Sequence, residues 1–191
     1  MNAQAMPRKD RLRRVGILCT NFARNLAYYR VGRKDEHSHL LVPAQNASAK
    51  FWRAVNANFI DMCALEWCKL FADKKDKHHW ANIVTRPDDF HAALLNHLGL
   101  DEAAFHEQIT IVRRYRDKFL AHLDSDYVMN IPALEIPKKA AWFYYGHMLD
   151  NEVDRSDMAG FPKDIDRGYE DTEREAEEIY RRVSMPPGRI E

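Results

Sequence analysis

The chain has 191 residues, of which 46% are hydrophobic and 30% charged, and these proportions are ordinary for a globular protein with one core. Its 29 lysines and arginines equal its 29 aspartates and glutamates, so the overall charge gives no indication of a nucleic-acid partner. The sequence contains no stretch of about 18 apolar residues and no signal-peptide segment, and we therefore expect a cytoplasmic protein without a membrane span.

Charge is unevenly distributed along the chain. The first 34 residues contain nine basic residues and one acidic residue, whereas residues 148–191 contain thirteen acidic and seven basic ones. Two interpretations stay open at this point. The oppositely charged ends attract each other, or the basic start of the chain contacts phosphate groups.

Apolar residues recur at steps of three and four over much of the chain, which predicts amphipathic helices. We expect a first helix over residues 9–33 and a second from Asn46 or Ser48 to about Phe71. Glu66 interrupts the apolar stripe of the second helix. A carboxylate at such a position needs a partner when it is buried, and an arginine of another helix is the obvious candidate.

Shorter elements follow the second helix. A helix is predicted from Pro87 to about Leu98, with Thr85 as its N-cap and Gly99 as its stop signal. A third major helix, capped by Asp101, is expected over residues 102–123.

The C-terminal third is predicted to begin with an irregular connection over residues 125–136, in which Pro132 and Pro137 act as breakers. A strongly apolar helix from Lys138 to about Val153 should then be buried all round, or buried on one side and paired with a second subunit on the other. The last helix is expected over residues 165–184, with one apolar face formed by Tyr169, Ala176, Tyr180 and Val183.

These elements predict an all-α fold, an up-and-down helical bundle with additional short helices. We expect one domain over residues 1–191, with a core at about residues 10–155 and an acidic C-terminal helix at about residues 165–184.

Neither the histidines nor the cysteines predict a metal site. Five histidines lie close together in the sequence, but their spacing matches no metal-ligand pattern. They are His78, His79, His91, His97 and His106. The three cysteines are an odd number, and their spacing is not that of a disulfide framework. Cys19, Cys63 and Cys68 are therefore expected to be buried free thiols in a reducing compartment. We therefore expect neither a metal nor another cofactor.

The end of the third major helix carries most of the chemistry that the chain offers. Arg116 lies in the apolar stripe of this helix, and His122 follows six residues later, about 120° around the axis and about 9 Å along it. A histidine titrates near neutral pH, and an arginine is a fixed positive charge. Together they suit metal-free RNA cleavage, in which one group transfers a proton at the 2′-hydroxyl and the other stabilises the phosphate. The structural alternative is that Arg116 pairs with a buried acid such as Glu66 and that His122 only closes the helix end.

The residues Arg116-Asp117-Lys118-Phe119-Leu120-Ala121-His122 resemble the signature of the HEPN superfamily (higher eukaryotes and prokaryotes nucleotide-binding domain). That signature is an arginine, a polar residue and, a few positions later, a histidine near the end of a bundle helix. The longer form up to Asp124 is similar to the branch near bacterial abortive-infection proteins, and so are residues 66–71 with His79-Trp80. The resemblance covers about residues 10–155.

The resemblance implies a helical bundle that forms a homodimer, with the two motif helices facing each other across a two-fold axis. In active members of the family the paired motifs form a metal-independent endoribonuclease site. Carried over to this chain, Arg116 would stabilise the phosphate, Asp117 would be the polar position, and His122 would transfer the proton. Neighbouring basic residues are the candidates for binding RNA, namely Arg113, Arg114 and Lys118.

Two functions remain open on this basis. The first is a ribonuclease of phage defence or of a toxin–antitoxin system, with RNA as its substrate and an antitoxin protein as a partner. The second is a non-catalytic helical module that binds RNA or other proteins, in which Arg116 and His122 are structural.

Overall fold

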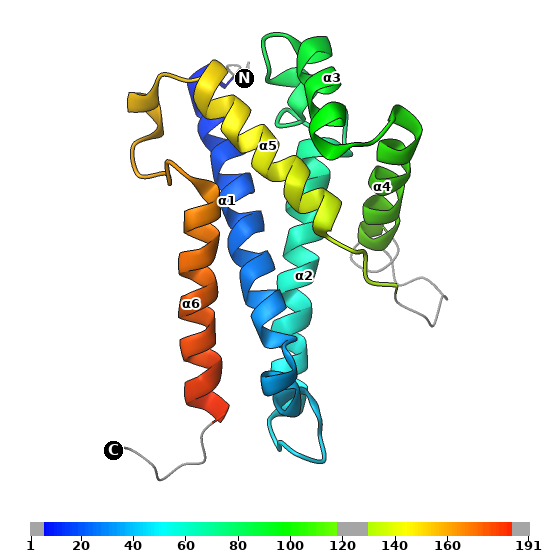
Figure 1. Cartoon of the computed structure of the whole chain (residues 1–191), viewed down its shortest axis with the longest axis vertical. Coiled ribbons are helices and arrows are strands. Elements are labelled where there is room, and N and C mark those ends of the chain that lie inside the picture. The colour runs from blue at the N-terminus through cyan, green and yellow to red at the C-terminus, as the bar shows by residue number, and fades with distance from the viewer. Residues whose placement is uncertain (1–5, 118–129, 185–191) are drawn as a thin grey trace, which may run out of the picture.

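Two long antiparallel helices form the frame of the molecule (Figure 1). They are α1 (Arg8–Gly32) and α2 (Ala49–Phe71), and a 3-10 helix, η1 (Asp35–Leu41), lies in the connection between them. The computed structural model describes residues 6–117 and 130–184. Over these residues the chain is all-α and contains no strand, as the sequence predicts. No helix in these two ranges is both long and apolar enough to span a membrane.

The remaining helices cover this pair on different sides (Figure 1). Helix α5 (Glu135–Asn151) crosses in front of α1 and α2, and α6 (Ile165–Ser184) packs along α1. Helices α3 (Pro87–Leu98) and α4 (Glu102–Tyr115) lie on the other side, next to α5 and α2 respectively. Two further 3-10 helices connect these elements, η2 (Trp80–Asn82) and η4 (Arg155–Met158).

The core lies where α1, α2 and α5 meet. Phe22, Trp67 and Tyr144 are each fully buried, one from each of these helices. The indole nitrogen of Trp67 donates a hydrogen bond to the backbone oxygen of Pro137 at 3.1 Å. This bond fixes the start of α5 against α2 and so positions the exposed face of α5.

Several predicted helix boundaries are confirmed. Gly99 ends α3 with a positive φ of 65°, a conformation that favours glycine, and the Asp101 side chain caps α4 by accepting the Ala104 amide at 2.8 Å. Pro137, predicted to precede its helix, lies instead in the first turn of α5, where its missing N–H costs nothing. The C-terminal helix keeps its predicted bounds, but Val183 is 43% exposed and does not belong to its buried face.

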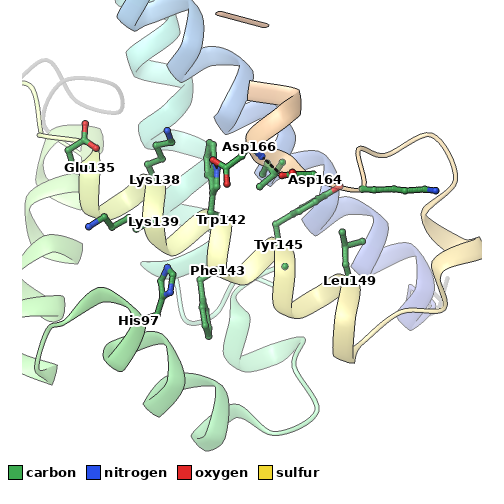
Figure 2. Close-up of a pocket in the computed structure, with 13 residues that line it drawn as sticks. His97, Glu135, Lys138, Lys139, Trp142, Phe143, Tyr145, Leu149, Asp164 and Asp166 are labelled. Atoms are coloured by element: carbon green, nitrogen blue, oxygen red, sulfur yellow. Dashed lines mark hydrogen bonds between the residues drawn. The ribbon is translucent and has the colours of Figure 1, made fainter. Parts of the chain in front are cut away.

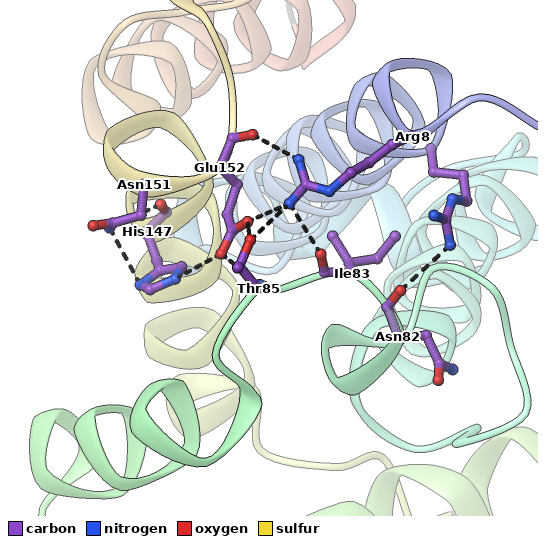
Figure 3. Close-up of polar contacts among 8 residues, drawn as sticks. Arg8, Asn82, Ile83, Thr85, His147, Asn151 and Glu152 are labelled. Atoms are coloured by element: carbon purple, nitrogen blue, oxygen red, sulfur yellow. Dashed lines mark hydrogen bonds and ion pairs between the residues drawn. The ribbon is translucent and has the colours of Figure 1, made fainter.

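Thr85 does not cap α3, because its polar groups are used elsewhere (Figure 3). Its backbone N–H and its hydroxyl both donate to the carboxylate of Glu152, at 2.9 and 2.7 Å. The same carboxylate forms an ion pair with Arg8 and lies 3.4 Å from His147 Nε2. Glu152 therefore joins the start of α1, the start of α3 and the end of α5.

The basic start of the chain is paired with acids from its C-terminal part. Lys9 forms an ion pair with Asp157, and Lys34 forms one with Glu177 of α6. Together with the Arg8 contact, these pairs support the first interpretation of the charge distribution, mutual attraction of the two ends, since several of the N-terminal cations are already bound to carboxylates.

Candidate functional site

The predicted site begins where α4 ends. Arg116 and Asp117 continue α4 in a π-helical turn, a local geometry that is frequent at functional positions. The Arg116 guanidinium binds two carboxylates: Nη1 contacts Asp73, which follows the end of α2, and Nη2 lies 2.8 Å from Asp117 Oδ1. The side chain of Arg116 is 17% exposed, so it still reaches the surface.

These contacts fix the charge and the position of Arg116. Burial disfavours the guanidinium charge, but hydrogen bonds to Asp73 and Asp117 outweigh burial and raise the pKa of Arg116 above its ordinary value. The side chain is therefore a permanent cation held by two planar acceptors. Such a group can bind a phosphate oxygen with those guanidinium N–H bonds that the two carboxylates leave available.

The expected pairing of an arginine with Glu66 is wrong. Arg116 binds Asp73 instead, and no arginine forms an ion pair with Glu66 within the described ranges. Glu66 is only 2% exposed, its Oε2 has no hydrogen-bond partner there, and burial raises its pKa to about 7. Asn21 and Asn25 of α1 are its polar neighbours. Burial thus shifts the equilibrium of this carboxyl group towards its protonated form.

Two arginines precede Arg116 on α4, and their surroundings differ. Arg113 donates a hydrogen bond to the backbone oxygen of Ala72 and so fastens α4 to the end of α2. Arg114 lies on the last turn of α4 with its side chain exposed. Two of the predicted site residues, Lys118 and His122, lie outside the described residues. The structure thus brings Arg113, Arg116 and Asp117 together and adds Asp73.

Asp73 was missed by the sequence reasoning, although a signal for it exists. It lies seven residues after Glu66, which is about two helical turns, and therefore continues the same helix face just beyond the predicted end of the second helix. An acid at that position is close to the surface and costs less to ionise than a buried one.

A groove on the outer side of α5 is the second feature of interest (Figure 2). Its volume is about 810 Å³, and its lining extends along α5 from Glu135 to Leu149. The aromatic rings of Trp142 and Phe143 contribute apolar surface to it, and Gly146 lies between them and Leu149 along the helix.

The acids that line this groove are bound within the chain. Glu135 forms an ion pair with Arg30, Asp164 accepts the backbone N–H of Asp166 at 2.9 Å, and Asp166 accepts the indole N–H of Trp142 at 2.6 Å. The lysines are placed differently. Lys138 lies over the Trp142 ring, and Lys139 and Lys163 have no carboxylate within ion-pair distance in the part of the chain that the structure describes.

The histidines and cysteines form no metal centre among residues 6–117 and 130–184. Burial lowers the pKa of His79 and so favours its neutral form, and its Nε2 lies 3.1 Å from the backbone oxygen of Phe71, a contact that holds the ring in the core. The three cysteines are free and buried as predicted, and burial raises the pKa of each thiol, which makes them poor nucleophiles.

No protein-family model, no curated protein and no solved structure matches this chain. The likeness to the HEPN superfamily therefore depends on the short motif and on the helical bundle around it.

Proposed function

We propose that this chain is a metal-independent endoribonuclease of HEPN type, acting in the cytoplasm in phage defence or in a toxin–antitoxin system. The observation that carries the proposal is the placement of Arg116. An arginine in the motif position is fixed by Asp73 and by the next motif residue, Asp117, at a π-helical turn on the surface of a helical bundle.

In this mechanism Arg116 stabilises the negative charge that develops on the scissile phosphate. His122 transfers the proton between the 2′-hydroxyl, which attacks the phosphorus, and the 5′-oxygen that leaves. Arg113, Arg114 and Lys118 bind the flanking phosphates. No metal or other cofactor takes part. A homodimer and an antitoxin protein as a partner belong to the same proposal.

One observation favours the second function, a non-catalytic module that binds RNA or other proteins. The Arg116–Asp73 contact joins α4 to α2 and would be useful for stability alone. The two functions differ in what is lost when His122 is replaced, because a structural histidine affects folding and a catalytic one affects turnover.

The test is the cleavage of structured RNAs by the purified protein in excess EDTA. Cleavage by the wild type is expected to fall by at least about a hundredfold in His122→Ala with the melting temperature unchanged. His106→Ala is the matched control, because His106 is an exposed histidine of α4. A wild type that cleaves none of the RNAs, or a His122→Ala protein that cleaves normally, contradicts the proposal and favours the non-catalytic module.

A further inference from the structure

A pocket of about 230 Å³ lies where the end of α1 approaches the start of α2 (Figure 1). Leu41, Ala57 and Ile60 contribute apolar surface to it, and two arginines, Arg33 and Arg53, contribute charge. Within the described ranges its lining contains no aspartate and no glutamate, unlike that of the groove along α5. The pocket is therefore positively charged, although the chain as a whole is neutral.

Both arginines are available to a ligand. Neither has a carboxylate within ion-pair distance in the part of the chain that the structure describes. Arg53 Nε donates a hydrogen bond to the backbone oxygen of Leu41 at 2.7 Å, which holds the side chain in place and leaves its two terminal nitrogens for a further acceptor. Arg33, which follows the last turn of α1, is exposed.

Tyr29 adds a hydroxyl group to this set of donors. Its side chain lines the same pocket and is half-buried. Burial raises the pKa of Tyr29, although the nearby charge of Arg33 counteracts this effect. The hydroxyl therefore keeps its proton at neutral pH and can donate a hydrogen bond to an anion beside Arg33.

The helix dipoles account for Arg33 but not for Arg53. A cation is favourable at the C-terminus of a helix, where Arg33 lies. Arg53 lies in the second turn of α2, near a helix start at which negative charge is favoured, and Lys50 adds another cation there. The first turn of α2 contains no acidic residue. An anionic ligand would supply the negative charge that this helix start lacks.

A phosphate monoester matches these donors. Near pH 7 it carries a charge of about −1.5 to −2 and offers three acceptor oxygens. Arg33 and Arg53 supply two positive charges in planar forks, a geometry that binds phosphate oxygens through paired N–H bonds. A carboxylate has a single charge and two oxygens, so it would leave one of the two arginines without a counter-charge.

We infer that this pocket binds a phosphate monoester through Arg33, Arg53 and the hydroxyl of Tyr29. The organic part of the ester lies on the apolar part of the lining. The ester belongs either to a small phosphorylated molecule or to the terminal phosphate of an RNA, and the experiment separates these two sources.

The pocket is distinct from the predicted ribonuclease site, so the inference does not rest on the proposed function. Ile60 is the lining residue of α2 that is nearest to Asp73 in sequence, and the thirteen positions between them correspond to about 20 Å along a helix. Arg116 contacts Asp73 and therefore lies near the opposite end of α2 from Arg53. A phosphate in the pocket does not occupy the position of the scissile phosphate.

The experiment is isothermal titration calorimetry of the full chain with inorganic phosphate, at constant ionic strength because salt screens such contacts. The wild type is expected to bind with a dissociation constant of about 1 mM or less. Arg33→Gln and Arg53→Gln should each weaken binding by at least about tenfold, since each removes a charged fork. Arg86→Gln is the matched control, because it makes the same change at an 80% exposed arginine of α3's start, and it should bind as the wild type does.

Tyr29→Phe is the second variant, because Arg53 also holds the Leu41 backbone and its replacement can affect folding. The change removes only a hydroxyl group and should weaken phosphate binding by about threefold or more, with the melting temperature of the free protein unchanged.

Two esters then identify the source of the phosphate. Ribose 5-phosphate is compared with ribose, and a 5′-phosphorylated 2′-O-methyl RNA oligonucleotide is compared with its 5′-hydroxyl form. Phosphate-dependent binding of the sugar alone indicates a small molecule, and phosphate-dependent binding of the oligonucleotide indicates an RNA end. If neither ester binds at least as tightly as inorganic phosphate, the inference is overturned.

Other outcomes also overturn it. They are the absence of phosphate binding at about 10 mM, and binding that Arg33→Gln and Arg53→Gln leave unchanged. Binding that is lost in Arg116→Ala but kept in the two pocket variants places the phosphate at the motif instead. RNA cleavage is measured separately, so failure of this inference is distinguishable from failure of the proposed function.

Discussion

Arg116, which follows α4, binds the carboxylate of Asp73, which follows the end of α2, and this contact connects two helices at the predicted site. The exposed fractions are 17% for the Arg116 side chain and 35% for that of Asp73, so water screens the pair only in part. The same contact explains why Arg116 does not pair with Glu66, because its guanidinium is bound to Asp73.

The strength of this contact can be measured with a double-mutant cycle. Arg116→Ala, Asp73→Ala and the double variant should give a coupling free energy of about 1 kcal/mol in urea unfolding, as expected for a partly exposed charged hydrogen bond. The pair Arg86–Asp89 at the start of α3 is the control, since its side chains are 80% and 68% exposed and its coupling should be close to zero. A coupling no larger than that of the control pair would mean that Arg116 is not held by Asp73.

Glu66 should make stability depend on pH in an unusual direction. Burial raises its pKa from 4.5 to about 7, so between these values the folded protein binds the proton more tightly than the unfolded one. The contribution of this group is complete below about pH 4.5 and is lost as the pH rises to about 7, a loss of up to about 3 kcal/mol.

The check is the pH dependence of the difference in unfolding free energy between the wild type and Glu66→Gln. The variant mimics the protonated acid, so it should equal the wild type near pH 4.5 and be more stable above pH 7. The use of a difference removes the effects of other titrating groups. A difference that does not change with pH would show that Glu66 is charged in the folded protein.

Glu152 has the opposite linkage. Burial alone would raise its pKa, but the hydrogen bonds from Thr85 and Arg8 outweigh burial and lower the pKa, so its contribution to stability is lost as the pH falls. Glu152→Ala should lower the unfolding free energy by about 2 kcal/mol at pH 7, because it leaves three donors without their acceptor (Figure 3). Glu36→Ala, at a 64% exposed glutamate, is the control and should change stability by less than about 0.5 kcal/mol. Equal losses in both variants would contradict the role of Glu152.

Two glycines should respond in opposite ways to substitution by alanine. A Cβ atom at Gly32 would lie 2.5 Å from Asn56 Nδ2 and even closer to the Tyr180 hydroxyl, so Gly32→Ala should destabilise the protein by about 1–3 kcal/mol. Gly146→Ala meets no neighbour and should stabilise a single copy by up to about 1 kcal/mol. Thermal unfolding at about 1 μM, where self-association is smallest, provides the measurement. A stabilising Gly32→Ala would show that α6 does not pack against the end of α1 as described.

The sequence by itself determined the helical elements of this protein and several of their ends. The bounds of α1, α2 and α6, the glycine stop at Gly99 and the cap at Asp101 all follow from local rules, because hydrophobic periodicity and capping depend on residues within a few positions of each other. The all-α fold follows from the same periodicity. The motif from Arg116 to His122 was likewise visible in the sequence, and its resemblance to the HEPN signature implies the expected role of each residue.

Only the tertiary structure decided which charges meet. Glu66 lies in α2, and Asp73 lies seven residues later, just beyond the end of that helix. The packing of α1 and α4 against α2 determines that Asn21 and Asn25 lie near the first acid and that Arg116 binds the second. In the same way, Thr85 donates its hydrogen bonds to Glu152 and does not cap α3, because the end of α5 lies next to the start of α3. The groove over Gly146 is also a product of packing, since its lining comes from α3, α5 and α6. Local sequence patterns specify helices, but the energy of a buried or bound charge is set by neighbours that are distant in the chain.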